Sequence, residues 1–146
     1  MFWSTYPVKL DDAKRFFLPS KFRDELADGL VMVKNQENCL SILPIAVANA
    51  QAERLLALPA DSYESRAQQR MFTDDAYPAT PDKQGRIAIP KGLCEWAQLD
   101  QDIVVRGVLD HVEIWNPAMW SAYRMIEGPK YATLNKPPEP PVATGT

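Results

Sequence analysis

The side chains best suited to bind a ligand lie in two charged motifs, Asp11-Asp-Ala-Lys-Arg15 and Asp82-Lys-Gln-Gly-Arg86. Each motif has an aspartate four residues before an arginine and leads through a short apolar run to a proline. An arginine offers five N–H donors in a planar fork that fits phosphate oxygens or the edge of guanine. The motifs indicate one of two roles: an arginine oriented by its aspartate for recognition, or an ion pair that only holds a tight turn. Exposed ion pairs contribute only about 0–1 kcal/mol, so stability explains weakly why both copies keep both partners.

Basic residues are concentrated around these motifs, although the whole chain is acidic. The net charge is −3 at pH 7, yet segments 9–23 and 82–91 hold eight of the sixteen Lys and Arg residues and three of the nineteen Asp and Glu residues. These segments therefore carry +5 and the rest of the chain carries −8. A basic face on an acidic protein is typical of a protein that presents one surface to a polyanion. The alternative is that solvated turns are simply rich in charged residues.

Catalytic and metal-binding residue sets are scarce. His111 is the only histidine, and Cys39 and Cys94 lie far apart in apolar surroundings. A Ser-His-Asp set and a zinc site therefore have no basis in the sequence, and no glycine-rich phosphate loop occurs. We expect no enzyme, no metal and no cofactor, with both cysteines as buried free thiols and His111 solvated or locally hydrogen-bonded.

The motifs belong to a longer internal repeat. Residues 82–90 correspond position for position to residues 11–19, and Leu93 corresponds to Phe22. After a slip of one residue, positions 112, 114 and 115 correspond to positions 40, 42 and 43. A unit that recurs within a chain is usually unable to bury its apolar face alone, and half of a 146-residue chain is marginal as a folding unit. We therefore expect the two copies to pack on each other and share one core.

Each copy is expected to contain a strand, the charged turn, a short strand, a helix and a hairpin. The ranges are 2–9, 16–18, 21–26, 30–33 and 39–43 in the first copy, and 76–80, 87–89, a helix through Leu93 and Ala97, 103–106 and 112–115 in the second. Ser20 is expected to cap the first helix, and Pro7 confines the first strand to an edge or an irregular position. Further helices are expected over 46–58 and 62–72, and from Asn116 to a stop at Gly128-Pro129.

Three stretches resemble the MraZ family of bacterial transcriptional regulators: Leu-Pro-Ser-Lys-Phe-Arg (18–23), Asp-Lys-Gln-Gly-Arg-Ile-Ala-Ile-Pro (82–90) and Val-Glu-Ile-Trp (112–115). The similarity extends from residue 1 to about residue 123. It implies an α+β, mostly β fold of two tandem AbrB-like (SpoVT-AbrB) swapped-hairpin halves, which form an intramolecular pseudo-dimer barrel with short helices. The implied division is 1–47 and 76–127 for the halves, 48–75 for connecting helices, and 128–146 for a proline-rich disordered tail.

The same resemblance implies a sequence-specific DNA-binding transcriptional regulator, expected to be a repressor of the division and cell-wall gene cluster. Its implied partners are double-stranded DNA with repeated promoter boxes and further copies of itself in a ring, with no membrane, cofactor or small-molecule substrate. The implied location is the cytoplasm, in association with the nucleoid. The DNA-contacting residues implied by the motifs are Asp11, Lys14, Arg15, Asp82, Lys83 and Arg86. An alternative of another class is a ring or adaptor that binds protein partners without reading DNA.

Two positions depart from the family pattern, which has glycine where this chain has Ser4 and Lys14. Glycine in such a turn supplies a positive φ. Lys14 must therefore adopt a left-handed conformation at a cost of about 1 kcal/mol, or the first turn has a different shape and meets DNA differently. In either case Lys14 can add a phosphate contact.

Aromatic residues near the two ends of the repeat region suggest an assembly surface. We expect Trp3, Tyr6, Trp120 and Tyr123 to lie at or near a head-to-tail interface between protomers, because exposed aromatic surface usually has a partner.

Overall fold

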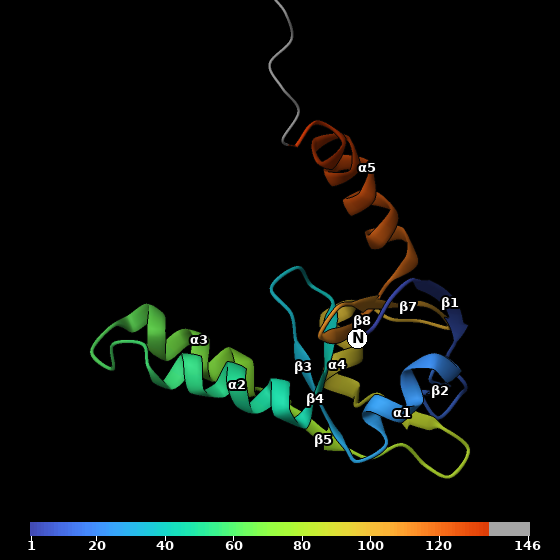
Figure 1. Cartoon of the computed structure of the whole chain (residues 1–146), viewed down its shortest axis with the longest axis horizontal. Helices are drawn as coiled ribbons and strands as arrows, with labels where there is room; N and C mark the ends of the chain where they lie inside the picture. Colours follow the sequence, from blue (N-terminus) through green and yellow to red (C-terminus); the bar gives the residue numbers. More distant parts are fainter. Residues whose placement is uncertain (135–146) are drawn as a thin grey trace, which may run out of the picture.

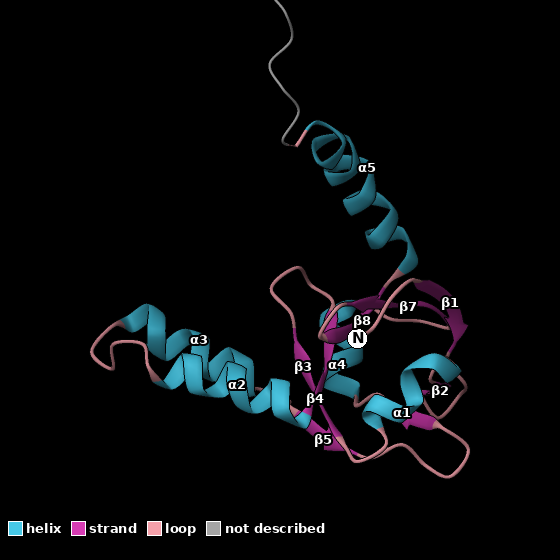
Figure 2. Ribbon diagram, viewed as in Figure 1, coloured by secondary structure: helices cyan, strands magenta, loops and turns pink. Residues whose placement is uncertain are grey.

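The computed structural model describes residues 1–134, and its elements follow the two-copy order (Figures 1 and 2). The first copy contains β1 (Thr5–Lys9), β2 (Arg15–Phe17), the 3-10 turn η1 (Ser20–Phe22), α1 (Arg23–Leu26), β3 (Leu30–Lys34) and β4 (Leu40–Pro44). The second contains β5 (Tyr77–Ala79), β6 (Arg86–Ala88), α4 (Lys91–Ala97), β7 (Asp102–Val108) and β8 (His111–Trp115). The copies are joined by α2 (Ile45–Leu56) and α3 (Tyr63–Thr73), and α5 (Pro117–Thr133) follows the second.

The two copies exchange strands. A six-stranded antiparallel sheet has the order β1-β7-β8-β4-β3-β5, and a separate two-stranded ribbon pairs β2 with β6. The first strand of each copy thus pairs with the third strand of the other, so that Val8 lies opposite Ile103 and Ala79 lies opposite Leu30. Neither copy could complete this sheet by itself.

The prediction that the two halves form a barrel is wrong, because the six-stranded sheet is open. Strands β1 and β5 lie at opposite ends of the six-stranded sheet, and in residues 1–134 no strand joins them. The other strands of the described chain, β2 and β6, pair with each other in a separate ribbon and do not close the sheet. Both edge strands contain a proline, Pro7 and Pro78, which agrees with the edge position predicted for Pro7.

The pairing registers reveal an approximate two-fold axis between the copies. In the ribbon, Phe16 lies opposite Ile87, the residue 71 positions later. In the sheet, Ser41 lies opposite Glu113, the residue 72 positions later. A residue faces its own counterpart only where the axis crosses a strand pair. The one-residue slip expected between the motif and the hairpin is therefore confirmed.

Backbone conformation repeats even where residue types do not. Left-handed φ angles occur in three pairs 71 residues apart: Ser4 (74°) with Asp75 (57°), Lys14 (61°) with Gly85 (81°), and Asn38 (59°) with Leu109 (65°). A positive φ is uncommon for residues other than glycine. Its recurrence at one spacing shows that the fold, rather than the local residue, imposes these turns.

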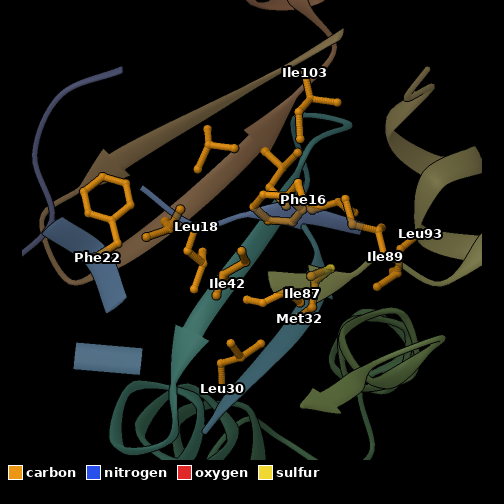
Figure 3. Close-up of a cluster of buried hydrophobic side chains, with 14 of the residues drawn as sticks. Phe16, Leu18, Phe22, Leu30, Met32, Ile42, Ile87, Ile89, Leu93 and Ile103 are labelled. Carbon is orange, nitrogen blue, oxygen red and sulfur yellow. The ribbon is translucent and has the colours of Figure 1, made fainter. Parts of the chain in front are cut away.

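One hydrophobic core is shared by the two copies (Figure 3). Its buried members include Phe16, Leu18, Phe22, Leu30, Met32 and Ile42 from the first copy and Ile87, Ile89, Leu93 and Ile103 from the second. Strand residues alternate between faces, so Phe16 and Ile87 point into the core while Phe17 is exposed. The prediction of a shared core is confirmed.

The remaining helices extend away from this body. Helices α2 and α3 lie side by side as a projecting hairpin, and α5 projects from a different part of the molecule (Figure 1). The base of the hairpin packs on β3 and β4 through a second cluster formed by Val33, Leu43 and Ala48 with Phe72. Helix α5 buries none of its residues.

Two local predictions are wrong. Ser20 does not cap a helix, because the chain enters the 3-10 turn directly after Pro19 and no side chain bonds to the free amides there. Helix α5 does begin with the predicted Asn116 cap, but it continues past Gly128 and Pro129 to Thr133. A proline within a helix removes one hydrogen bond, and Gly128 keeps a negative φ, so neither residue forces an end here. The expected tail from residue 128 thus includes helix up to 133, and 135–146 lie outside the described residues.

Replacing Phe16 with Ala should lower the free energy of unfolding by about 3–5 kcal/mol, because a fully buried ring on the two-fold axis is lost and a cavity remains. Phe17→Ala is the matched control, since this neighbour is 53% exposed and should cost less than about 1 kcal/mol. Denaturant titration of both variants measures the difference. Equal losses of unfolding free energy in the two variants would contradict the finding that Phe16 faces the core and Phe17 faces solvent.

Candidate nucleic-acid interface

The first charged turn is built around the carboxylate of Asp11. Its Oδ1 accepts hydrogen bonds from the backbone amides of Ala13 at 2.9 Å and Arg15 at 2.8 Å. Its Oδ2 accepts a hydrogen bond from Nε of Arg15 at 3.0 Å. The backbone closes the same loop, because the amide of Lys14 donates to the carbonyl of Asp11 at 2.9 Å. One carboxylate therefore sets both the turn and the direction of the arginine.

The second turn reproduces this geometry around Asp82. Oδ1 accepts from the amides of Gln84 at 2.9 Å and Arg86 at 2.8 Å, and Oδ2 accepts from Nε of Arg86 at 2.9 Å. The amide of Gly85 donates to the carbonyl of Asp82 at 2.9 Å. Because Lys14 has a φ of 61° and Gly85 a φ of 81°, the two turns have the same shape. Of the two alternatives for Lys14, the left-handed one is correct.

Each arginine uses only part of its hydrogen-bonding capacity in the turn. The Nε bond to the aspartate is the only hydrogen bond that the side chain of Arg15 or Arg86 makes within residues 1–134. Both guanidinium groups are partly exposed. Their terminal nitrogens are thus held in one direction by the aspartate and remain available to a ligand.

The ribbon of β2 and β6 presents both turns on one surface. Arg15 lies opposite Ala88, and Arg86 lies opposite Phe17. All four side chains lie on the face opposite to Phe16 and Ile87, which point into the core. Lys14 and Lys83 are exposed within the turns themselves. The structure thus brings the six motif residues predicted from the sequence together on the ribbon and its two turns. The two-fold axis relates Asp11 to Asp82 and Arg15 to Arg86, whereas Lys14 and Lys83 occupy different positions of their turns.

Phe17 belongs to this surface and was not predicted. Its ring is 53% exposed, and Cζ of Arg86 lies 5.9 Å from the centre of the ring. Alternation along the strand is the signal that could have found it, since an apolar residue next to the buried Phe16 must face outward. An exposed aromatic ring beside an arginine adds an apolar contact to a surface that is otherwise cationic.

Hydrogen bonding lowers the pKa of both motif aspartates below its ordinary value of 3.8. The largest cause is the backbone amide of the arginine, Arg15 or Arg86 respectively, and burial opposes the shift. A carboxyl whose pKa is lower in the folded state contributes stability above its unfolded pKa, and this contribution is lost as the pH falls through the folded value. Both carboxylates therefore stay charged, and the turns keep their shape, until the pH drops below about 3.8.

A second polar network lies away from the ribbon, around Glu113. The carboxylate of Glu113 accepts hydrogen bonds from Nη1 of Arg106 and Nε1 of Trp115, both at 2.9 Å. His111 lies 3.2 Å from Glu113 and 2.8 Å from Asp110, so it is locally hydrogen-bonded, as predicted. The hydrogen bond to Glu113 is the main cause that raises the pKa of His111. The carboxylate of Glu113 thus pairs with side chains of the same protomer, while Nε of Arg106 is buried without a hydrogen-bond partner among residues 1–134.

This network supports the start of α5. The guanidinium carbon of Arg106 lies 3.8 Å from the ring centre of Trp120, and Trp120 stacks on Tyr123 with ring centres 5.7 Å apart. The network thus packs against the first turns of α5.

Among residues 1–134 no group of three or more His, Cys, Asp and Glu side chains is placed to hold a metal ion. Cys39 and Cys94 are free and buried, and burial raises the pKa of both thiols. No helix between residues 1 and 134 combines the length and apolar character needed to cross a membrane.

The fold and the ribbon surface together define a class: a chain with two strand-exchanged copies of one unit, each presenting an arginine turn on a common face. A family model described as "MraZ protein, putative antitoxin-like" matches residues 1–71 and again residues 71–126. The chain belongs to the MraZ family.

Relatives that carry the name "Transcriptional regulator MraZ" match along most of their length. The relative from Nocardioides sp. is 44% identical over 137 residues, which cover 94% of this chain and 95% of the relative. The relative from Salinispora arenicola is 45% identical over 123 residues, covering 84% and 87%. The relative from Cutibacterium acnes is 39% identical over 134 residues, covering 92% and 94%.

Replacing Arg86 with Ala should leave the pKa of Asp82 below 3.8, because the largest cause of the shift is the backbone amide at position 86, which the substitution retains. The pKa should rise only part of the way, through loss of the guanidinium. Carbon-detected NMR titration of the Asp82 carboxyl group measures this pKa. The same titration of Asp11 in the Arg15→Ala variant repeats the experiment at the first turn. A return to the ordinary value would show that the ion pair, rather than the amides, holds the turn.

Proposed function

We propose that this protein is a DNA-binding transcriptional regulator that reads DNA with the face formed by β2, β6 and their two turns. The observation that carries the proposal is the pair of arginines, Arg15 and Arg86, whose Nε atoms are bonded to aspartates while their terminal nitrogens remain available. The name shared by the relatives supports it.

A two-stranded ribbon is one of the elements that the major groove of B-DNA admits. In this arrangement Arg15 and Arg86 reach guanine edges or phosphates, and their aspartates keep the guanidinium groups oriented before binding. Lys14 and Lys83 contact phosphates, which add affinity through counterion release without carrying sequence information. The rest of the chain carries a charge of −8, which disfavours non-specific binding of DNA elsewhere on the surface.

One ribbon offers a small basic surface, so a single protomer binds weakly. Repeated boxes bound by several linked protomers convert modest affinities into useful ones, because each further contact becomes intramolecular. We therefore infer a ring-shaped homo-oligomer that occupies repeated elements in the promoter of the division and cell-wall gene cluster and represses transcription by blocking access. This role requires no catalysis or cofactor and places the protein in the cytoplasm, at the nucleoid.

The side-chain contacts within the protomer lead us to change part of the assembly surface expected from the sequence. Tyr6 packs edge-on against Phe22 at 5.4 Å, and Trp120 stacks within the chain as described above, so both have intramolecular partners. Trp3 is 61% exposed, and α5 adds Met125 at 79% and Ile126 at 60%. We propose that Trp3 and the outer surface of α5 form the contact between protomers.

Arg86→Ala and Arg15→Ala should each abolish specific operator binding while leaving the thermal midpoint nearly unchanged, because a partly exposed loop side chain contributes little to stability. The sequence alone favours a smaller effect at Arg15, but the two turns share one geometry, so comparable losses are expected. A gel shift with the upstream region of the protein's own gene, across a salt series, measures the losses.

Arg70→Ala is the matched control for this series, because Arg70 is an exposed arginine on α3 outside the ribbon. Unchanged affinity of the Arg86 variant at moderate salt would reject this site. Absence of specific binding by the unmodified protein would favour the adaptor that binds only protein partners.

Trp3→Ala combined with Ile126→Ser should shift the protein towards smaller species and weaken binding to DNA with several boxes far more than binding to one box. Arg124→Ala, which removes a charged instead of an apolar side chain from the same turn of α5, serves as the control. Light scattering at micromolar concentration reads the assembly state. An intact assembly with unaltered multi-box binding would place the interface elsewhere.

A further inference from the structure

We propose that Arg23 is a phosphate-contacting residue of the second turn and does there what Lys14 does in the first. The inference rests on the proposed DNA-binding function and concerns how the two turns acquire their positive charge. The two turns have the same backbone shape but different residues at the left-handed position. The turn that lacks a basic residue there receives one from the other copy.

At the second turn, the side chain of Arg23 lies directly over Gly85. A Cβ atom built on Gly85 would meet Nε of Arg23 at 2.7 Å and its Cδ and Cζ at 3.0 Å. Nε of Arg23 donates a hydrogen bond to the carbonyl of Leu18 at 3.0 Å, and the amide of Leu18 donates to the carbonyl of Gly85 at 2.9 Å. A residue of the first copy therefore covers the turn of the second, and only glycine leaves room for it.

At the first turn, the large and the small residue exchange places: the turn has a lysine where the second has glycine, and the covering position has a cysteine where the second has arginine. Lys14 lies 71 residues before Gly85, and Cys94 lies 71 residues after Arg23. The surrounding bonds are conserved: Sγ of Cys94 lies 3.6 Å from the carbonyl of Ile89, and the amide of Ile89 donates to the carbonyl of Lys14 at 2.8 Å. Where the second turn has Arg23, the first has a hollow of about 650 Å³ lined in part by Lys14 and Cys94.

Each turn thus combines one long basic residue with one small residue, but the copies assign them to opposite positions. Packing alone requires only that one of the two be small. What both arrangements preserve is one cation at the left-handed position of each turn: Lys14 itself in the first, and Arg23 over Gly85 in the second, where Lys83 is a further cation. The bond from Nε to Leu18 is the only hydrogen bond that the Arg23 side chain makes in the described chain, so its terminal nitrogens are available for phosphate.

The two cations differ in rigidity, which makes the two turns unequal partners for DNA. Lys14 is a point charge on a flexible stem, whereas Arg23 is a planar fork held by its Nε bond. Phosphate contacts set the register of a protein on the duplex, and base contacts specify the sequence. We expect Arg23 to act on affinity and salt dependence, and the motif arginines to act on sequence preference.

The test compares Arg23→Cys, Arg23→Lys and the double change Arg23→Cys with Gly85→Lys on a single-box duplex across a salt series. Arg23→Cys should lower the slope of log affinity against log salt by about 0.9 for each bound protomer, and should weaken binding on the order of five- to tenfold at 0.1 M salt. Arg23→Lys should keep most of the slope. The double change should restore it, because it installs the residue pair found at the first turn.

Controls separate charge from folding. Arg70→Cys removes the same charge from α3 and should leave the slope unchanged. Gly85→Lys alone should lower the thermal midpoint, because its Cβ would meet the side chain of Arg23, and Arg23→Cys should relieve that loss. The reciprocal change at the first turn, Lys14→Gly with Cys94→Arg, should also retain the wild-type slope.

Two results would overturn the inference while the proposed function stands: Arg23→Cys with a wild-type slope although Arg86→Ala loses binding, or folded Arg23→Lys and double variants no better than Arg23→Cys. Failure of the unmodified protein to bind DNA would instead refute the proposed function itself.

Discussion

The exchange of strands between the two copies is the constraint on which the rest of the structure depends. Because β1 pairs with β7 and β5 with β3, each copy needs the other to complete its sheet. The same two-fold relation places Phe16 against Ile87 in the ribbon and buries both in the shared core. The charged turns are therefore held at a fixed separation by backbone pairing and core packing, and not by contacts between the turns themselves.

Within each turn, the aspartate fixes the shape of the loop and the direction of the arginine side chain. Two backbone amides and one guanidinium nitrogen converge on each carboxylate, and the residue at the left-handed position helps to close the loop only through its backbone amide, not through its side chain. That residue is consequently free to vary between Lys14 and Gly85, at a cost of about 1 kcal/mol for the lysine. The freedom lets the two copies distribute charge differently around one shape.

Much of this arrangement could be predicted from the sequence, because residue types repeat where burial or charge demands them. Phe16 with Ile87, the two Asp-Arg pairs and the edge position of Pro7 are of this kind. Whether the sheet closes into a barrel could not be predicted from residue types, because closure depends on whether the two edge strands pair with each other in space. The contact between Arg23 and Gly85 was missed for a related reason, because it joins residues of different copies and has no counterpart with the same residue types. The end of α5 was misplaced because Gly128 and Pro129 permit a stop without enforcing one.

The open edges of the six-stranded sheet limit how this protein can grow into larger assemblies. Pro7 and Pro78 lie 71 residues apart, so the two-fold axis puts a proline on the outer strand at each end of the sheet. A proline has no N–H to offer to an incoming strand. Lengthening of the sheet from one molecule into the next is therefore disfavoured at both ends, which protects a symmetric β protein from stacking into fibrils. In the proposed homo-oligomer, contacts between protomers therefore use side chains and helices, whose geometry allows a closed ring.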